Sequence, residues 1–263
     1  MLPLEKMPAD KRAGIKWILT DIDDTLTEEG KLGAEAYSAL WALREAGIGV
    51  VPVTGRPAGW CDAIARQWPV DAVVGENGAL VYFEDKGCLQ RMYHPLAADP
   101  DKAQIRLQRL FKDVQAVVPR ARLAKDQFSR MFDLALDFAE EAPLLGRQEI
   151  DDMCRVCDQA GAIAKVSSIH VNAWYGNYSK LGMSEMYLRE QHAVDIYDEG
   201  AGVVYIGDSP NDCPMFAAVP LSVGVANVVD FQDQMDPLPM YVTGLRGGAG
   251  FAEFARLILD AKK

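Results

Sequence analysis

A short apolar segment that runs into a cluster of carboxylates constrains this chain more than any other feature. The segment 17–19 is followed within a few positions by Asp21, Asp23 and Asp24. Carboxylates packed together repel one another, so an ordinary buried strand gains nothing from ending in three of them. The cluster binds a hard cation, performs acid–base or nucleophilic chemistry, or forms a solvated turn, where Asp is common. Matching segments further along the chain favour the first two interpretations.

Strand and helix patterns alternate on both sides of a central segment, and this alternation predicts a parallel α/β sheet. The apolar runs are continuous, as strands buried on both faces require. The strands are expected at 15–21, 48–53, 71–75, 202–206 and 221–225, and the helices at 34–46, 57–68, 180–191, 213–218 and 250–261. Residues 1–14 are expected to lie loosely on the surface, and 241–242 to add an edge strand.

The central segment has the pattern of a second, α+β domain. A hairpin of strands is expected at 80–83 and 88–93, and the pattern changes after it to strands at 131–138 and 163–175 with helices at 99–117 and 147–160. Alternating apolar and polar residues in the later strands indicate antiparallel strands with one exposed face. We therefore predict an α/β fold in which residues 1–84 plus 179–263 form a Rossmann-like, doubly wound core and residues 85–178 an inserted α+β domain.

Polar side chains recur at the carboxyl ends of the predicted parallel strands, or just after them. They are Asp21 and Asp23, the segment Thr54-Gly55-Arg56, Lys180, and Asp208 with Asp212. Ligands of open α/β sheets bind at this edge, so groups that are far apart in the sequence can converge there. Each segment is weak evidence alone, because an isolated lysine on a helix is usually a solvated charge. Their joint order indicates one site.

The residue types in this set suit phosphoryl transfer assisted by a metal. Asp21 and Asp208, with a backbone carbonyl near Asp23, offer the oxygen ligands that Mg²⁺ prefers. A carboxylate can also attack phosphorus and form a covalent intermediate. Because both partners are anionic, a cation must offset their repulsion, and Mg²⁺ and Lys180 would do so. The hydroxyl of Thr54 would hold the transferring oxygens. These residues do not distinguish Mg²⁺ from Mn²⁺.

The order of the segments resembles the motifs of the haloacid dehalogenase (HAD) superfamily of phosphohydrolases, beginning with Asp21-x-Asp23-x-Thr25 after an apolar strand. The resemblance implies that Asp21 is the nucleophile and Asp23 the general acid and base. It implies phosphate contacts from Thr54, Gly55, Arg56, Lys180 and Asn211, and a Mg²⁺ site formed by Asp21, Asp23, Asp208 and Asp212. Lys165 is a rival for the lysine position, but Lys180 lies where the core pattern resumes.

The place of the insert, between Thr54 and Lys180, resembles the C2-capped type IIB group of that superfamily. This group contains Cof-like sugar phosphatases and relatives that act on sucrose phosphate or mannosyl-3-phosphoglycerate. The segment Gly75-Glu76-Asn77-Gly78 is also typical of the group, although a tight glycine-rich turn explains it equally well. The cap of such enzymes reads the leaving group, and the candidates here are Ser167, Ser168, His170, Asn172, Tyr175, Asn177 and Arg130. A solvent-facing strand explains each of them equally well.

Composition limits the partners of the chain. Of its 263 residues, 49% are hydrophobic and 25% charged, and the net charge of −11 disfavours nucleic acid and anionic membranes as partners. We expect no membrane span and no signal peptide, because the sequence contains no apolar stretch of the required length. The odd number of cysteines, 5, favours reduced thiols and a cytoplasmic protein. The expected partner is a small phosphorylated substrate, and the protein is expected to be a monomer or homodimer.

These expectations converge on a phosphatase for a small phosphorylated metabolite, and the type IIB resemblance implies that this metabolite is a sugar phosphate. A mannosyl-3-phosphoglycerate phosphatase is the closest named alternative. A phosphomutase or phosphotransferase on the same scaffold shares the first half-reaction, so the motifs do not separate it from a phosphatase. A binding protein without turnover would be expected to carry a damaged motif, and the motifs here are intact.

Overall fold

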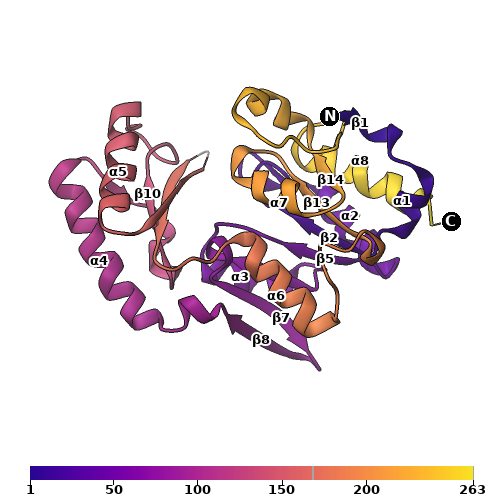
Figure 1. The fold of residues 1–263 in the computed structure, drawn as a ribbon, viewed down its shortest axis with the longest axis horizontal. Coiled ribbons are helices and arrows are strands. Elements are labelled where there is room, and N and C mark those ends of the chain that lie inside the picture. The colour runs from indigo at the N-terminus through magenta and orange to yellow at the C-terminus, as the bar shows by residue number, and fades with distance from the viewer. Residues whose placement is uncertain (168, 263) are drawn as a thin grey trace.

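A parallel sheet forms the centre of the larger part of the molecule (Figure 1). The computed structural model describes residues 1–167 and 169–262. The sheet has the order β1-β15-β14-β13-β2-β5, and every neighbouring pair is parallel. In that order the strands are Leu2–Pro3, Tyr241–Val242, Ser222–Gly224, Val203–Gly207, Trp17–Thr20 and Gly49–Pro52. The expected parallel α/β core is confirmed.

Helices cover both faces of this sheet, which explains the continuous apolar runs. Along β2, Ile18 packs into the cluster on one face and Leu19 into the cluster on the other. The first face is covered by α2 (Ala34–Glu45), α3 (Ala58–Gln67) and α8 (Gly247–Asp260), and the second by α6 (Lys180–His192) and α7 (Cys213–Ala218). Successive strand residues point to opposite faces, so both must be apolar here. This is the doubly wound arrangement that the sequence predicts.

A three-stranded sheet continues the core beyond β5. It consists of β6 (Ala72–Gly75), β7 (Leu80–Asp85) and β8 (Cys88–Tyr93), paired antiparallel. Beside β5, the backbone N–H of Thr54 donates to the carbonyl of Val74 at 2.8 Å. The expected domain boundary at residues 84 and 85 falls inside the β7–β8 hairpin. We propose that the inserted domain begins after Tyr93, because β8 pairs with β7 along its whole length.

The inserted domain forms the smaller part of the molecule, at the left of Figure 1. Its antiparallel sheet has the order β11-β12-β10-β9, and the strands are Ile163–Val166, His170–Trp174, Asp133–Asp137 and Arg122–Leu123. Helices α4 (Pro100–Val117) and α5 (Arg147–Gln159) cover one face, where Leu136 and Val171 join their apolar side chains. Because side chains alternate along a strand, the other face carries Asp133, His170 and Asn172.

The prediction that residues 1–14 lie loosely on the surface is only partly right, because most of them are exposed but the segment is anchored by a strand and two buried side chains. β1 forms an edge of the parallel sheet, and α1 (Ala9–Gly14) follows it. Leu4 and Met7 are each 1% exposed. Two isolated apolar residues in a polar segment gave no periodic signal, yet each fills a place in the core. No helix within 1–167 and 169–262 is long and apolar enough to cross a membrane.

Two strand predictions are wrong. The single strand expected at 163–175 is the hairpin of β11 and β12, in which the N–H of Ser167 donates to the carbonyl of His170 at 2.8 Å. Val171 and Ala173 of β12 pack with α4 and α5, whereas Ile163 of β11 packs against the core cluster and Val166 is exposed, so the apolar pattern did not mark one face of one strand. The strand at 241–242 is not at the edge of the sheet, since β1 pairs with its outer side.

Candidate active site

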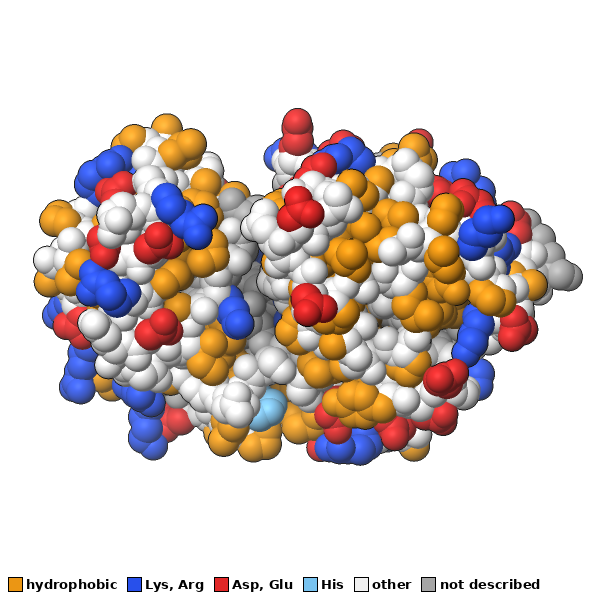
Figure 2. All heavy atoms as spheres, turned by 45° about the horizontal axis from the view of Figure 1, so that its top comes forward, with side chains coloured by type: hydrophobic (Ala, Val, Ile, Leu, Met, Phe, Trp, Pro, Cys, Tyr) orange, Lys and Arg blue, Asp and Glu red, His pale blue; other side chains and the backbone are white. Residues whose placement is uncertain are grey.

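A cavity of about 600 Å³ lies where the core meets the inserted domain. The surface is hollowed between the two parts (Figure 2). The cavity brings together most of the predicted site residues from distant parts of the sequence. Those that line it are Asp21, Asp23, Gly55, Arg56, Arg130, Ser167, His170, Asn172, Lys180, Asp208 and Asn211. The cavity therefore joins the carboxyl edge of the parallel sheet to the inner face of the inserted sheet.

Three buried carboxylates meet at the core side of this cavity. Asp21, Asp208 and Asp212 each have an oxygen that lies within 4.8 Å of an oxygen of the others. Burial raises the pKa of Asp21 to about 7, and the charges of Asp212 and Asp23 add to this effect against the ion pair with Lys180. Burial and the neighbouring carboxylates also raise the pKa of Asp208 well above its ordinary value. Oxygen ligands that are buried and repel one another suit a hard divalent cation.

Asp208 is held by two side chains whose roles the sequence analysis did not assign. The hydroxyl of Thr25 donates to Asp208 Oδ1 at 3.2 Å, and Asn227 Nδ2 donates to Oδ2 at 3.0 Å. Asn227 also donates to the backbone carbonyl of Asp24 at 2.9 Å. It follows β14 at the same sheet edge as Asp21 and Asp208. The rule that polar residues gather at this edge would have identified Asn227 if it had been applied to the last strand pair.

Asp212 has both carboxylate oxygens occupied by protein donors. Its Oδ2 accepts from the backbone N–H groups of Asp208, at 3.0 Å, and Ser209, at 3.3 Å. Its Oδ1 accepts from the hydroxyl of Tyr205 and from Lys180 Nζ. A Cβ at Gly207 would lie 2.4 Å from Asp212 Oδ2, so this close approach requires glycine. Asp212 thus orders the loop after β13 and adds negative charge to the cluster; among the described residues, each of its oxygens has two protein donors, whereas each oxygen of Asp208 has one.

Lys180 begins helix α6 and points its ammonium group into the acidic cluster. Its Nζ lies 2.6 Å from Asp21 Oδ1 and 3.3 Å from Asp212 Oδ1. Burial by itself would lower the pKa of Lys180, but the two carboxylates raise it above its ordinary value, so the group stays charged. The rival Lys165 is exposed on β11 and is not among the residues that line the cavity. The structure thus brings Lys180, rather than Lys165, to the carboxylates.

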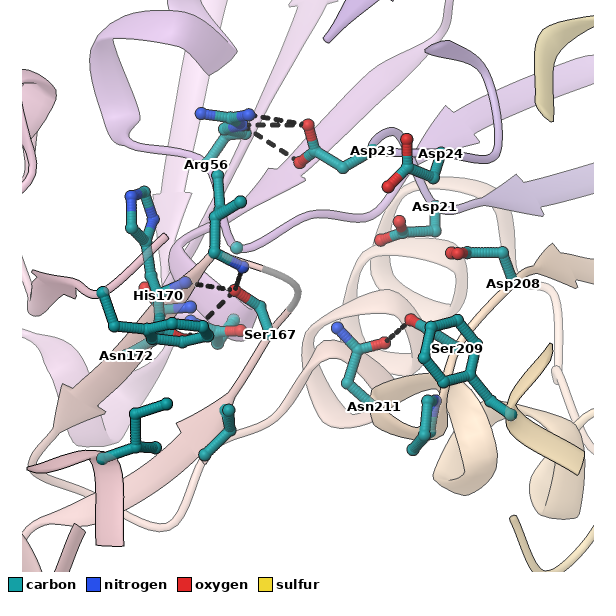
Figure 3. Close-up of a pocket in the computed structure, with 18 of the residues that line it drawn as sticks. Asp21, Asp23, Asp24, Arg56, Ser167, His170, Asn172, Asp208, Ser209 and Asn211 are labelled. Atoms are coloured by element: carbon teal, nitrogen blue, oxygen red, sulfur yellow. Dashed lines mark hydrogen bonds and ion pairs between the residues drawn. The ribbon is translucent and has the colours of Figure 1, made fainter. Parts of the chain in front are cut away.

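The segment Thr54-Gly55-Arg56 reaches the cavity in an unexpected way. Thr54 is fully buried and its Oγ1 accepts from the backbone N–H of Arg56 at 3.0 Å. The guanidinium of Arg56 binds the carboxylate of Asp23, with Nη2 to Oδ1 at 2.8 Å. Figure 3 shows Asp23 turned toward Arg56, whereas Asp21 and Asp208 lie side by side. Asp23 is therefore separate from the three-carboxylate cluster.

The inserted domain contributes polar side chains from β12 and its turn. His170 Nε2 and Glu140 Oε2 share a hydrogen bond at 2.8 Å. Asn172 is buried, and its Oδ1 has no hydrogen-bond partner in the part of the chain that is described. Ser167 accepts from the N–H of His170 at 3.0 Å. An unsatisfied acceptor at the wall of a cavity is suited to a ligand donor.

The remaining predicted residues have different surroundings. Tyr175 lies under the guanidinium of Arg106, whose Cζ is 3.6 Å from the ring centroid, and Asn177 is exposed. Neither is among the residues that line the cavity. Asn211 lies at the cavity and accepts a hydrogen bond from Ser209 at 3.0 Å. Ser168 lies outside the described residues.

A buried carboxylate at the junction ties the core to the inserted domain. Glu76 is 0% exposed, and its Oε1 accepts from the N–H groups of Ala58, at 2.9 Å, and Met131, at 2.8 Å. Its Oε2 accepts from the N–H groups of Phe132, at 2.6 Å, and Asp133, at 3.2 Å. Burial and the charge of Asp133 together raise the pKa of Glu76 to about 8, against the opposing effect of the backbone donors. The sequence analysis left a role for Glu76 open.

Comparison with known proteins assigns the chain to a family. The model of the haloacid dehalogenase-like hydrolases matches residues 18–107. A phosphoglycolate phosphatase of Methanothermobacter thermautotrophicus is 30% identical over 245 residues, which are 91% of this chain and 96% of that protein. The chain belongs to the haloacid dehalogenase-like hydrolases. The family resemblance that the sequence predicts is confirmed. Because the relative is named as a phosphatase, phosphatase activity is also supported for this chain.

Solved structures share the fold along nearly the whole chain. A Thermoplasma acidophilum protein, 0175, has a TM-score of 0.71 at 18% identity, covering 93% of this chain and 99% of that one. The sucrose-phosphatase of Synechocystis, solved with sucrose and phosphate, has a TM-score of 0.63 at 17% identity, covering 92% and 97%. A type IIB sugar phosphatase is also among these HAD neighbours. The HAD core with an inserted cap, as in type IIB, is thus confirmed.

Proposed function

We propose that this HAD hydrolase is a Mg²⁺-dependent phosphomonoesterase that acts through a phospho-aspartate on Asp21. The observation that carries the proposal is the convergence of Asp21, Asp208 and Lys180 beneath the cap. Buried anions and a buried cation at one end of a parallel sheet are costly to fold, and phosphoryl transfer gives each of them a use.

The acidic cluster fits a divalent cation. Asp21 and Asp208 would hold Mg²⁺, with the backbone carbonyl near Asp23 as a further oxygen ligand and Asp212 contributing charge. Burial and the neighbouring carboxylates raise the pKa of Asp21 and of Asp208, and a divalent cation would favour the ionised form of both groups. When bound, Mg²⁺ supplies charge neutralisation for the attacking carboxylate and the phosphoryl oxygens.

The reaction uses two carboxylates of one loop. An oxygen of Asp21 attacks phosphorus and forms a P–O bond, while the P–O bond to the leaving oxygen breaks. Asp23 donates a proton to that leaving oxygen. Asp23 then takes a proton from a water molecule as this water attacks phosphorus, which releases phosphate and restores Asp21. Lys180 and the backbone around Thr54 and Gly55 hold the transferring oxygens, and Asn211 lies where it can bind the same group.

The substrate is a small phosphorylated metabolite, and phosphoglycolate is the first candidate. The relative that matches 91% of this chain is named for that substrate. A sugar phosphate is the second candidate, because the cavity of about 600 Å³ also accommodates a sugar. The polar side chains of His170, Asn172 and Ser167 would then bind its hydroxyl groups. Mannosyl-3-phosphoglycerate and the acceptor of a phosphomutase belong to the same class of ligand.

Phosphate release tests this proposal. The panel contains phosphoglycolate, sugar phosphates and mannosyl-3-phosphoglycerate, each assayed with Mg²⁺ and with EDTA. We expect Mg²⁺-dependent release, and a loss of at least about 10³-fold in Asp21→Asn, because a carboxamide is a poor nucleophile. Asp85→Asn, an exposed residue on the β7–β8 hairpin, is the matched control. Activity retained in Asp21→Asn would refute the nucleophile, and transfer of phosphate to a second sugar rather than to water would favour the mutase.

A further inference from the structure

The guanidinium of Arg56 is directed at Asp23 rather than at the acidic cluster. Its Nε lies 3.1 and 3.0 Å from the two oxygens of Asp23, and its Nη2 lies 2.8 Å from Oδ1 (Figure 3). The family resemblance implies a phosphate contact for this arginine. We propose instead that Arg56 is a positioning residue that orients Asp23 and makes this orientation depend on the cap. The inference rests on the proposed role of Asp23 as general acid and base.

Asp23 needs a partner to hold one orientation. Its side chain is 33% exposed, at the wall of the cavity. Within 1–167 and 169–262, all hydrogen bonds to its carboxylate come from Arg56. A short exposed side chain without a partner exchanges rotamers rapidly. Two donors of a planar guanidinium fix both the position and the plane of a carboxylate. Arg56 thus keeps Asp23 facing the cap side of the cavity, where a leaving group would lie.

Core and cap both determine where the guanidinium of Arg56 lies. On the core side, its Cζ lies 4.5 Å from the ring centroid of Trp60 in α3. On the cap side, its Nη1 lies 3.9 Å from Asp126 Oδ2 and 3.7 Å from Glu140 Oε1. These separations exceed a hydrogen bond, so the cap acts on Arg56 through charge. Arg56 is mostly buried, so these charges are less screened than on an open surface.

The two cap carboxylates are themselves held in place. Glu140 shares a hydrogen bond with His170 of β12 at 2.8 Å. Asp126 accepts from Arg130 Nε at 3.3 Å, and Arg130 Nη1 donates at 2.9 Å to the carbonyl of Gly55, the residue before Arg56. Movement of the cap would therefore remove two negative charges from one edge of Arg56. Arg56 then holds Asp23 in this orientation most firmly when the cap is docked on the core and the cavity is complete.

Leaving-group chemistry separates this role from phosphate binding. An alkoxide needs a proton as it leaves, whereas 4-nitrophenolate is stable without one. A residue that binds the transferring phosphate contributes equally to both reactions. A residue that positions the general acid contributes mainly to the alkyl reaction. The ratio kcat/KM covers the steps up to formation of the phospho-aspartate, in which the leaving group departs.

The experiment compares 4-nitrophenyl phosphate with the alkyl phosphate that the wild type hydrolyses fastest. For Arg56→Met we expect kcat/KM to fall about 100-fold with the alkyl ester and less than about fivefold with the aryl ester. Arg56→Lys retains one charged donor, so its alkyl activity should lie between those of wild type and Arg56→Met. In Asp23→Asn, the further change Arg56→Met should have little additional effect. Arg66→Met, an exposed arginine of α3, is the matched control.

The cap side has its own test. Glu140→Gln removes one of the two charges and should lower alkyl activity several-fold with little change for the aryl ester. Equal losses for both esters in the Arg56 variants, with melting temperatures near that of wild type, would overturn the positioning role in favour of phosphate binding. Unchanged activity of Glu140→Gln with the alkyl ester would show that the orientation of Asp23 does not depend on the cap. A wild-type protein without phosphatase activity would refute the proposed function and, with it, this inference. If the wild type is active, the differences in activity between wild type and the variants test the role of Arg56 alone.

Discussion

Lys180 lies between two buried carboxylates, and its charge offsets part of their repulsion. The ammonium group contacts Asp21 at 2.6 Å and Asp212 at 3.3 Å, and the side chains of all three residues are nearly or fully buried. Removing one partner from a buried ion pair leaves a charge without compensation, which is far more costly than losing a surface pair. Lys180 should therefore matter for folding as well as for phosphate binding.

Replacing Lys180 with methionine should reveal both roles. We expect Lys180→Met to reduce phosphatase activity by at least about 100-fold, because no ammonium group then faces the phosphoryl oxygens. The free energy of unfolding in EDTA should fall by about 3 kcal/mol, because Asp21 and Asp212 lose their partner. Chemical denaturation and phosphate release measure the two effects. Lys165→Met is the control and should behave like wild type; the opposite result would transfer the role to Lys165.

Residues whose position follows from the ends of strands were predictable from the sequence. Asp21 and Asp208 lie together because the edge of a parallel sheet collects them, and Lys180 reaches them from the first turn of α6. The partners of Asp23 and Glu76 were not predictable. Arg56 reaches Asp23, and Glu76 reaches the N–H groups of 131–133, only through the packing of the cap on the core. A single sequence carries no signal for such a contact between distant segments.

At the scale of elements, the turn that follows β6 contacts the start of α3, the inserted domain and the residue before α6. Glu76 and Asn77 adopt positive φ angles of 45° and 57°, in the left-handed region that non-glycine residues rarely occupy. Gly78 has a φ of 102°, and a Cβ there would lie 2.0 Å from the carbonyl oxygen of Ser179. Ser179 precedes Lys180, so the glycine lets the turn pack against the start of α6. The segment therefore forms a tight turn and also places Glu76 where its carboxylate can anchor the inserted domain to the core.

The anchoring role predicts a local effect of Glu76→Gln. The new amide group would face backbone N–H donors, so at least one of the four hydrogen bonds should be lost, with about 2 kcal/mol of stability. Amide hydrogen exchange of Met131, Phe132 and Asp133 should accelerate more than exchange in the core strands. The exposed Glu84 of β7 provides the control, Glu84→Gln. Unchanged protection of the three amides would show that Glu76 does not hold the cap.

Most helices and strands were predictable, and the errors have local causes. Helix α4 begins at Pro100 after Asp99, whose side chain accepts from the N–H of Lys102, a capping pattern visible in the sequence. The hairpin of β11 and β12 was read as one strand because its turn did not interrupt the alternation of apolar residues. Periodicity reports which face a residue occupies, but not where the chain reverses.

At the scale of the whole molecule, the buried carboxylates with a raised pKa in the described part of the chain lie in two places, the acidic cluster and the junction between core and cap. Burial raises the pKa of Asp21 to about 7 and that of Glu76 to about 8, and it also raises the pKa of Asp208 and Asp133. Each of these groups binds a proton more tightly in the folded state than in the unfolded chain. Only the first place can be neutralised by a cation, because Glu76 and Asp133 are enclosed by backbone donors, Asn77 and Arg130.

This arrangement predicts how stability depends on pH and on metal. Between about pH 4 and pH 8 these four carboxyl groups hold more protons in the folded protein than in the unfolded chain and outnumber His94 and His192, whose pKa is lowered by burial, so the free energy of unfolding in EDTA should fall as the pH rises through this window. Mg²⁺ should restore stability chiefly above pH 7, where Asp21 is ionised, and by about 2.7 kcal/mol at a concentration 100 times its Kd. Urea denaturation at pH 5, 6, 7 and 8, with EDTA or Mg²⁺, measures both effects.

The two places can be separated by Asp208→Asn and Glu76→Gln. Asp208→Asn should remove the response to Mg²⁺ and flatten part of the pH dependence in EDTA, because one buried charge is gone from the cluster. Glu76→Gln should leave the response to Mg²⁺ intact, because Glu76 hydrogen bonds to backbone N–H groups rather than to the cluster. A protein in EDTA that gains stability from pH 5 to pH 8 would contradict the raised pKa values, whereas a Mg²⁺ response equal at pH 5 and pH 8 would contradict a cation site built from Asp21 and Asp208.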